Sequence, residues 1–386
     1  MIVQVININS PNVFDEFNNK YNIFKYLREK GYFGFEIRNI SDEIAAELHQ
    51  YFLKNDIFSY LKKNKFVSLF VLGTFEQILE DSNAIKSNID ENVGHKISSV
   101  INNYLTYNAT KSGVINISHD YSLIMGILNA TPDSFSDGGK YFNLDSALEH
   151  IKLMNESGAD IIDVGGESTK PGSKPIAEEE ELKRVIPIFD EFGKSDKYNF
   201  SIDTRKSKIA EESLKRGAKI VNDISGLTFD SGMIDVIKKY NAACVIMHMK
   251  GNPENMQENP LYTDVVSEVY DFLYKKVSLA KKSGIKNIII DPGIGFGKTV
   301  SDNFKLLNRL DEFKGIGCPI LIGVSKKSII GKSLNLKIDE REVSTAILES
   351  ISLVNGAKII RTHNVVNADY GRKLFYFTKY PSRIKC

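Results

Sequence analysis

The sequence predicts an α/β protein, a (β/α)8 TIM barrel preceded by a small α+β domain. The chain has 386 residues, which suits a barrel of ~250 residues with an accessory unit. From Ser122 onward, apolar strands alternate with helical segments eight times. Several helices end in a glycine that leads into the next strand, as in ESGAD, KRGAK and KSGIK, which is the usual C-terminal stop of a helix.

The N-terminal part, residues 1–118, is predicted to be an accessory domain of unknown role. The runs IVQVINI, FGFEIRNI and FVSLFVLGT predict strands, and Phe14–Lys30, Ser41–Lys54 and Val93–Tyr107 predict helices, with Ser41 as the N-cap of the second. This part has no glycine-rich phosphate loop and no clustered histidines. A regulatory ligand, a dimer contact and a partner enzyme all remain open as its purpose.

The second part, residues 119–386, carries the eight strands of the barrel. They are SLIMGIL, ADIIDVG, FSID, KIVNDI, ACVIMHM, NIIIDPG, PILIGV and AKIIRT. Predicted helices between them are Ser146–Glu156, Glu178–Phe192, Ser207–Arg216, Val265–Ser283 and Arg341–Val354. The spacing leaves room for a crossover helix each time. The alternative is a doubly wound open sheet, which usually carries a GxGxxG turn after its first strand; this sequence has none there.

Composition narrows the class of protein. Lysine plus arginine number 50 and aspartate plus glutamate 49, so net charge gives no reason to expect nucleic acid or a membrane surface as partner. The three cysteines form no CxxC pair, which argues against a disulfide framework or structural zinc. No apolar run reaches the ~18 residues of a membrane span, and the N-terminus lacks the basic region of a signal peptide. We expect a cytoplasmic protein.

Polar residues stand where the barrel strands end, which is the catalytic face of such barrels. They include Asn129 after the first strand, Asp203, Asn222 and Asp291 on later strands, Lys327 and Ser328 after the seventh, and Arg361 and His363 after the eighth, while the apolar Met247 stands at the end of the fifth. A purely structural explanation is that Asp163, Asp203 and Asp291 are neutralised by neighbouring lysines and arginines. That explanation is reasonable for one carboxylate and poor for eight strands together.

These residues favour particular ligands. Arg361, His363 and Asn129 are expected to converge between the eighth and first strands, where phosphate sites often form, and Mg2+ held by an amide or carboxylate oxygen would complete a diphosphate site. The sequence contains no Ser–His–Asp elbow and no HExxH motif, which disfavours acyl transfer and zinc hydrolysis.

A second group of strand-end residues is rich in hydrogen-bond acceptors. Asp203, Asn222 and Asp291 suit a flat heterocycle with an amino-pyrimidine edge, because a carboxylate accepts two N–H bonds at once. Met247 offers a soft wall for the face of a ring.

Seven motifs, in order along the chain, resemble those of the dihydropteroate synthase family. They are NATPDSFSDGG from Asn129, GADIIDVGGESTKPG from Gly158, DTRK from Asp203, NDISG from Asn222, DPGIGFGK from Asp291, GVSKKS from Gly323 and RTH from Arg361. The resemblance runs from about Leu123 to Arg372. One such motif would be weak evidence, whereas seven in register are strong.

The resemblance implies an enzyme that joins 6-hydroxymethyl-7,8-dihydropterin diphosphate to p-aminobenzoate and releases diphosphate, in folate biosynthesis. It implies a pterin site of Asp203, Asn222, Met247, Asp291, Lys327 and Arg361. It implies a diphosphate site of Asn129, Arg361 and His363, with Mg2+ as cofactor on Asn129. It implies p-aminobenzoate contacts from Phe135, Thr169, Pro171, Phe296 and Ser328. Catalysis would rest on Asn129, Asp203, Lys327, Arg361 and His363. The family also implies a homodimer and a sulfonamide target.

The sequence departs from the family pattern at three positions. Ala130 replaces the common valine, and Lys170 and Lys326 stand where arginine is usual. Lysine cannot reproduce a bidentate guanidinium contact, so we expect altered affinity with activity retained. Two alternatives remain, a pterin-binding methyltransferase that acts with a corrinoid partner and a non-catalytic pterin-binding barrel. The first would usually lack the long loop after the first strand, and the second would usually have lost Asn129, Arg361 or His363.

Overall fold

The computed structural model describes residues 1–9, 11–21, 31–63, 67–107, 121–131, 144–170 and 172–384. The chain divides into two compact units. The first comprises Met1–Asn108 and Arg309–Gly317, and the second comprises Ala109–Asn308 and Cys318–Cys386. The predicted boundary at residue 118 lies outside the described residues. Among the described helices, none has the length and apolar character needed to cross a membrane.

The first unit contains a four-stranded antiparallel sheet in the order β1-β2-β4-β3. Its strands are β1 (Ile2–Ile6), β2 (Phe33–Arg38), β3 (Ser59–Lys63) and β4 (Val67–Gly73), and its helices are α1 (Pro11–Tyr21), α2 (Asp42–Lys54), α3 (Phe75–Asn88) and α4 (Glu91–Leu105). Sequence reasoning found β1, β2 and β4 but not β3 or α3. Ser41 caps α2 by accepting a hydrogen bond from the Ile44 amide at 3.4 Å, as predicted.

The sheet of the first unit has one apolar face and one face that carries polar groups. Alternate residues such as Val5, Phe35 and Val71 are buried with Leu48 and Ile97 in one core cluster, as the period of two in a strand requires. Gln4 and Glu36 occupy alternating positions with these residues, and they are buried as well. Buried polar groups need hydrogen-bond partners, and these partners come partly from far along the chain.

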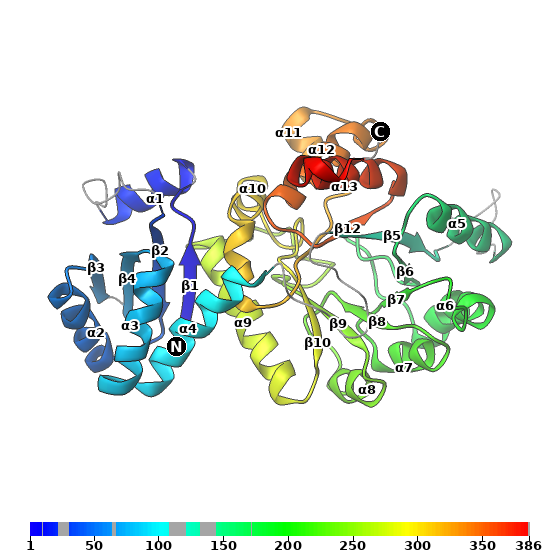
Figure 1. The fold of residues 1–386 in the computed structure, drawn as a ribbon. Helices are drawn as coiled ribbons and strands as arrows, with labels where there is room; N and C mark the ends of the chain where they lie inside the picture. The colour runs from blue at the N-terminus through cyan, green and yellow to red at the C-terminus, as the bar shows by residue number, and fades with distance from the viewer. Residues whose placement is uncertain are drawn as a thin grey trace. The chain divides into compact units, whose positions relative to one another are not determined.

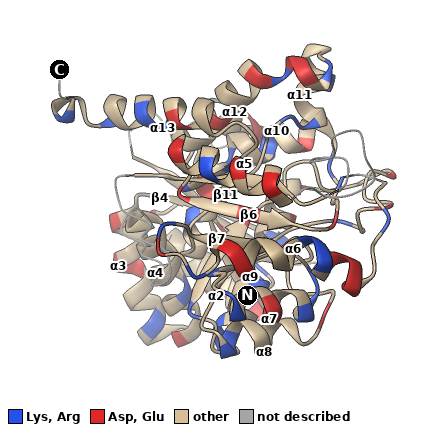
Figure 2. Ribbon diagram, turned by 90° about the vertical axis from the view of Figure 1, so that its right-hand side faces the viewer, with Lys and Arg blue, Asp and Glu red and all other residues tan. Residues whose placement is uncertain are grey.

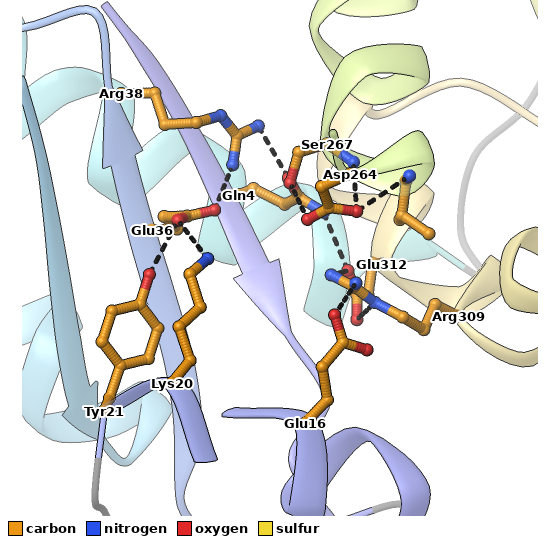
Figure 3. A network of polar contacts seen from close by, with 11 residues as sticks. Gln4, Glu16, Lys20, Tyr21, Glu36, Arg38, Asp264, Ser267, Arg309 and Glu312 are labelled. Carbon is orange, nitrogen blue, oxygen red and sulfur yellow. Dashed lines mark hydrogen bonds and ion pairs between the residues drawn. The ribbon is translucent and has the colours of Figure 1, made fainter. Parts of the chain in front are cut away.

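The segment Arg309–Gly317, which includes the 3-10 helix Leu310–Ile316, supplies those partners. The Gln4 amide donates to Glu312 at 2.8 Å, and its carbonyl accepts from Arg38 at 2.7 Å. Arg309 holds Glu312 through two hydrogen bonds of 2.8 Å each (Figure 3). Glu36 accepts from Arg38 at 2.6 Å (Figure 3). This segment lies within residues 119–386, which the sequence predicts to be the barrel.

The second unit is a barrel of eight parallel strands surrounded by helices (Figure 1). The strands are β5 (Leu123–Asn129), β6 (Ile161–Gly165), β7 (Phe200–Asp203), β8 (Ile220–Asp223), β9 (Ala243–Met247), β10 (Asn287–Asp291), β11 (Leu321–Ile322) and β12 (Ile359–Thr362). Their order is β10-β9-β8-β7-β6-β5-β12-β11, and a bridge between Ile290 and Ile320 joins the two ends. The predicted (β/α)8 TIM barrel is confirmed.

The helices of the barrel lie outside its strands. They are α5 (Leu144–Glu156), α6 (Glu178–Phe192), α7 (Ser207–Lys215), α8 (Met233–Lys239), α9 (Val265–Lys282), α10 (Val300–Asn308), α11 (Ser328–Leu334), α12 (Glu342–Val354) and α13 (Val365–Lys379). Outer helices such as α6 and α7 carry both acidic and basic residues (Figure 2), and ion pairs such as Arg184–Glu180 and Lys208–Glu178 join them. Inside the barrel, side chains such as Met125, Ile161, Val245 and Ile359 form one buried cluster, so the interior is packed and the polar groups gather at the strand ends.

Candidate active site

Arg361, at the end of β12, is held by two buried carboxylates. Its Nε donates to Asp163 at 2.6 Å and its Nη2 donates to Asp203 at 2.7 Å. Asn222, on β8, donates to the same Asp163 oxygen at 2.9 Å. Four strands therefore contribute to one network, and the predicted residues Asp203, Asn222 and Arg361 lie together in it.

The carboxylates of this network retain unused hydrogen-bonding capacity. Asp163 Oδ1 and Asp203 Oδ1 are buried and have no hydrogen-bond partner among the described residues. Burial raises the pKa of Asp203 to about 7, against the opposing charge of Arg361, and Asp163 adds to the rise. Unsatisfied buried acceptors are rare in folded proteins. They are suited to a ligand that brings N–H donors.

Asp291 and Lys327 form a second part of the site. Burial raises the pKa of Asp291, and the charge of Lys327 opposes the rise. The Lys327 ammonium donates to the carbonyl of Ile294 and lies 4.6 Å from the centre of the Phe296 ring. Burial lowers the pKa of Lys327 to about 8, while Asp291 opposes the shift. Arg361 acts on the pKa of both residues, so the two parts are electrostatically one site.

His363 follows Arg361 directly and is oriented by Ser325. The Ser325 hydroxyl accepts from the His363 amide at 3.1 Å and lies 3.0 Å from its ring Nδ1. Burial of part of the ring, followed by the charges of Arg361 and Lys326, lowers the pKa of His363. The residue still reaches the surface, and its ring is neutral at pH 7. Ser325 is therefore the residue that decides how the imidazole is presented.

Asn129 and Met247 lie at the ends of their strands as predicted. Asn129 is the last residue of β5, paired in register with Gly165 of β6, and it is half-buried. Its side chain makes no hydrogen bond with another described residue, so its amide oxygen is available to a hard cation such as Mg2+. Met247 is buried at the end of β9.

The loop after β6 is anchored by a network of charges. Glu167 accepts from Lys206 at 2.8 Å and from Arg205 at 3.0 Å. Lys206 also donates to the buried Glu181 at 2.7 Å, and Glu181 accepts from Thr204 at 2.8 Å. Burial favours a higher pKa for Glu167, but the hydrogen bonds from Lys206 and from the Ile176 amide outweigh it and lower the pKa. The first residues of the loop therefore have a fixed position.

The glycine loop after β10 is braced by a buried lysine. Lys298 donates to the carbonyls of Gly293 at 2.8 Å and Phe296 at 3.0 Å, and its ammonium lies 3.0 Å from His248 Nδ1. Burial lowers the pKa of Lys298 to about 7. Gly297 has φ +64°, and a Cβ there would lie 2.3 Å from the Lys250 carbonyl. Only glycine fits this close approach.

The residues expected around p-aminobenzoate are only partly described. Thr169 is half-buried in the loop after β6, and Phe296 is half-buried beside Lys327. Ser328 is exposed and lines a cavity of about 340 Å3 together with Gln257 and Lys298. Phe135 and Pro171 lie outside the described residues.

Sequence reasoning did not include Asp163 among the site residues. The structural explanation for this carboxylate, neutralisation by a neighbouring cation, does apply, because Asp163 pairs with Arg361. The pairing builds the site, because the same guanidinium reaches Asp203. The signal was an aspartate inside the apolar strand IIDVG, since a strand interior rarely carries a charge without a partner.

The barrel part of the chain is similar in sequence to a family of known proteins. Residues 125–363 match the model of the pterin binding enzyme family. A dihydropteroate synthase of Clostridium beijerinckii is 44% identical over 254 residues, which cover 65% of this chain and 92% of the relative. The dihydropteroate synthase of Escherichia coli is 43% identical over 253 residues, which cover 65% of this chain and 89% of the relative.

The chain belongs to the dihydropteroate synthase family. The Yersinia pestis dihydropteroate synthase, solved in complex with a sulfonamide drug, superimposes with a TM-score of 0.66 at 36% identity, covering 69% of this chain and 98% of that one. The Xanthomonas albilineans enzyme, solved in complex with 7,8-dihydropteroate, superimposes with a TM-score of 0.61 at 32% identity, covering 68% and 95%. The family model begins at residue 125, so residues 1–124 precede the range that it matches.

Proposed function

We propose that this protein is a dihydropteroate synthase, a transferase that condenses 6-hydroxymethyl-7,8-dihydropterin diphosphate with p-aminobenzoate and releases diphosphate. The observation that carries the proposal is the Asp163–Arg361–Asp203 network, with Asn222 attached, at the mouth of a barrel of this family. A fixed guanidinium between carboxylates with unused acceptor oxygens is suited to an amino-pyrimidine edge, and it has no evident purpose in an apolar barrel core.

The pterin is proposed to enter this network. Asp203 and Asn222 would form hydrogen bonds with its N–H groups and ring nitrogens. Asp291 would contact the same ring system, and Met247 would pack against the ring face. Lys327 is to donate to the pterin carbonyl. Support comes from the unused oxygens of Asp163 and Asp203 and from the mutual electrostatic influence of Asp291 and Lys327.

The diphosphate is proposed to leave toward Asn129, Arg361 and His363. Mg2+, held by the Asn129 amide oxygen and by phosphate oxygens, would offset the charge that develops on the leaving group. A neutral His363 can donate one N–H to the diphosphate while Ser325 holds the other ring nitrogen. An arylamine is already nucleophilic, so the barrier lies in diphosphate departure, and preorganised cations and dipoles are the useful catalytic groups.

p-Aminobenzoate is proposed to bind between Thr169, Phe296 and Ser328, with Phe135 and Pro171 from the loops after β5 and β6. The N-terminus of α11 follows Lys327, and backbone amides at a helix start suit a carboxylate. The two loops are to exclude water from the cation-like pterin methylene until the amine attacks. Sulfonamides would compete at this position.

We also propose a homodimer formed through α12 and α13. Val343, Ile347, Ile351, Val354 and Leu374 are exposed, and they line a groove of about 510 Å3. A contiguous apolar surface of this kind is typical of a protein interface. A solution mass at micromolar concentration tests this: a monomer would count against it, and Ile351→Glu should convert a dimer to monomer.

The proposed reaction is tested by using mass spectrometry to measure the formation of dihydropteroate from the two substrates. Methyl-tetrahydrofolate binding separates the methyltransferase alternative, which predicts tight binding of that ligand. A non-catalytic binder predicts pterin binding with no product.

The cytoplasm is the proposed location, and the free buried thiols of Cys244 and Cys318 are compatible with its reducing conditions.

A further inference from the structure

The loop after β6, residues 167–176, is closed on itself by the carboxylate of Glu167. The Ile176 amide donates to Glu167 Oε2 at 3.1 Å, so the first residue of the loop is bonded to the last. Only 9% of the Glu167 side chain is exposed. Thr169, which is proposed to contact p-aminobenzoate, lies between the two ends. The position of Thr169 therefore depends on what holds Glu167.

Lys206 binds both ends of this loop. Its ammonium donates to Glu167 Oε2 at 2.8 Å, to the Ile176 carbonyl at 2.8 Å and to Glu181 at 2.7 Å. An ammonium group has three N–H donors, and these three hydrogen bonds use all of them. The other oxygen of Glu167, Oε1, therefore needs a different donor, because a buried carboxylate oxygen is costly to leave without one.

Arg205 supplies that donor, and an aromatic ring helps to orient it. Arg205 Nη2 donates to Glu167 Oε1 at 3.0 Å, and the guanidinium carbon lies 4.2 Å from the centre of the Phe229 ring. The Nε of Arg205 is buried and has no hydrogen-bond partner among the described residues. The carboxylate and the ring, from the loops after β6 and β8, therefore fix the guanidinium plane between them.

The middle of the loop is held by neutral hydrogen bonds. Ser173 donates to the Lys170 carbonyl through its amide at 3.0 Å and through its hydroxyl at 2.6 Å. The Gly172 amide donates to the Pro253 carbonyl, in the loop after β9, at 2.9 Å. Hydrogen bonds that involve an ionised group are roughly twice as strong as neutral ones. The contacts of Glu167 are therefore the strongest of those that hold this loop.

We propose that Glu167 and Arg205 are a pair of positioning residues that hold the loop after β6 where it contacts p-aminobenzoate. Glu167 acts through the two ends of the loop, Arg205 acts through Glu167, and neither touches a substrate. A loop that is already ordered binds its ligand without the entropic cost of ordering. Loss of the pair should therefore weaken p-aminobenzoate binding and leave the departure of diphosphate unchanged. This inference rests on the proposed function.

Steady-state kinetics of the full chain with Arg205→Met test the proposal. This variant keeps an apolar side chain against Phe229 and leaves Glu167 bonded to Lys206 and Ile176, so the fold is retained. The KM for p-aminobenzoate should rise about tenfold, the size of one hydrogen bond to a charged group. The kcat and the KM for dihydropterin diphosphate should change by less than about twofold. Arg205→Lys, which keeps a charged donor, should restore part of the lost affinity.

A double-variant comparison shows whether the two residues act through one contact. Glu167→Gln should raise the same KM, and adding Arg205→Met to it should raise that KM no further, because the effects of residues in contact are not additive. Glu212→Gln is the control, since Glu212 pairs with Lys215 on the outer helix α7, and it should behave like the native protein.

Hydrogen exchange measures the hold on the loop without any turnover. The amides of Gly172 and Ile176 should exchange faster in Arg205→Met and in Glu167→Gln than in the native protein. Unchanged exchange in both variants would overturn the proposal, as would an unchanged KM for p-aminobenzoate or equal losses in kcat and both KM values. If the native protein forms no product, the proposed function fails instead, and exchange still decides whether the pair holds the loop.

Discussion

Arg361 Nη2 lies 2.7 Å from Asp203 Oδ2, and this contact joins residues that are 158 positions apart in the chain. The same guanidinium binds Asp163 through its Nε. The barrel thereby fixes a cation between two carboxylates before any substrate arrives. Preorganisation of this kind avoids reorientation of dipoles during the reaction.

Asp163→Asn tests this arrangement. The substitution removes the charge from one partner of a buried ion pair, which typically costs about 3 kcal/mol of unfolding free energy, and it should lower turnover because Arg361 loses its position. Chemical denaturation and a turnover assay measure the two effects. Asp190→Asn is the matched control, since Asp190 pairs with Arg216 at an exposed position and should change stability little. Equal stability of the two variants would contradict the prediction.

Lys327 and Lys326 are adjacent but should respond differently. Lys327→Ala should nearly abolish turnover, because it removes the cation beside Asp291. Lys326 pairs with Glu342 and has φ +55°, and Lys326→Arg keeps the charge, so it should be tolerated. Steady-state diphosphate release compares the two. Native rates in Lys327→Ala would show that the assigned pterin site is wrong.

The rate should also depend on the protonation of Lys327. Burial lowers the pKa of this ammonium to about 8, so its positive charge is present below that pH and is lost as the pH rises through it. The rate per bound pterin should fall accordingly on the alkaline side. A flat profile from pH 7 to 9.5 would exclude a role for the charge.

Glu349→Gln should raise stability at neutral pH. Burial on α12 raises the pKa of Glu349 to about 8, so the folded protein keeps its proton up to about that pH, whereas the unfolded chain releases it near 4.5. Between these two pH values folding takes up a proton. The free energy of unfolding of the native protein therefore falls as the pH rises through this window. At pH 7 the difference amounts to roughly 3 kcal/mol. Urea denaturation at pH 4.5 and 7 measures it; a gain that does not grow with pH would contradict the account.

In the N-terminal unit, Glu312→Gln should destabilise by about 3 kcal/mol, because it leaves Arg309 buried beside a neutral partner. Both residues are almost fully buried. Glu180→Gln, which affects the exposed pair with Arg184, is the control and should change stability by less than about 1 kcal/mol. Unfolding of the first unit can be followed by hydrogen exchange of β1 and β2. Unchanged protection there would show that the pair does not stabilise this unit.

Much of the fold could be predicted from the sequence because it depends on local patterns. Apolar runs ending in polar residues located all eight barrel strands, and the Ser41 signature located a helix start. The partners of Gln4 could not be found in this way, since Glu312 lies 308 positions away. The sequence therefore predicts a barrel from residue 119 onward. Only the three-dimensional structure reveals that Arg309–Gly317 belongs to the first unit.

The same limit applied to the site. Strand-end positions predicted that Asp203, Asn222, Lys327 and Arg361 lie at one face of the barrel, because parallel strands bring their ends together. Asp163 lies inside its strand, and its partner is 198 positions away, so no local pattern revealed its contact with Arg361. Glu349 is similar, since a glutamate on a helix is usually exposed and its burial depends on how α12 packs.

The most direct test of the central claim is diphosphate release by the purified protein. The assay would contain dihydropterin diphosphate and Mg2+, with or without p-aminobenzoate. We predict release that depends on p-aminobenzoate and is accompanied by an equal amount of dihydropteroate. Tight pterin binding without release would contradict the proposed reaction, and it would favour a methyltransferase or a non-catalytic pterin-binding barrel.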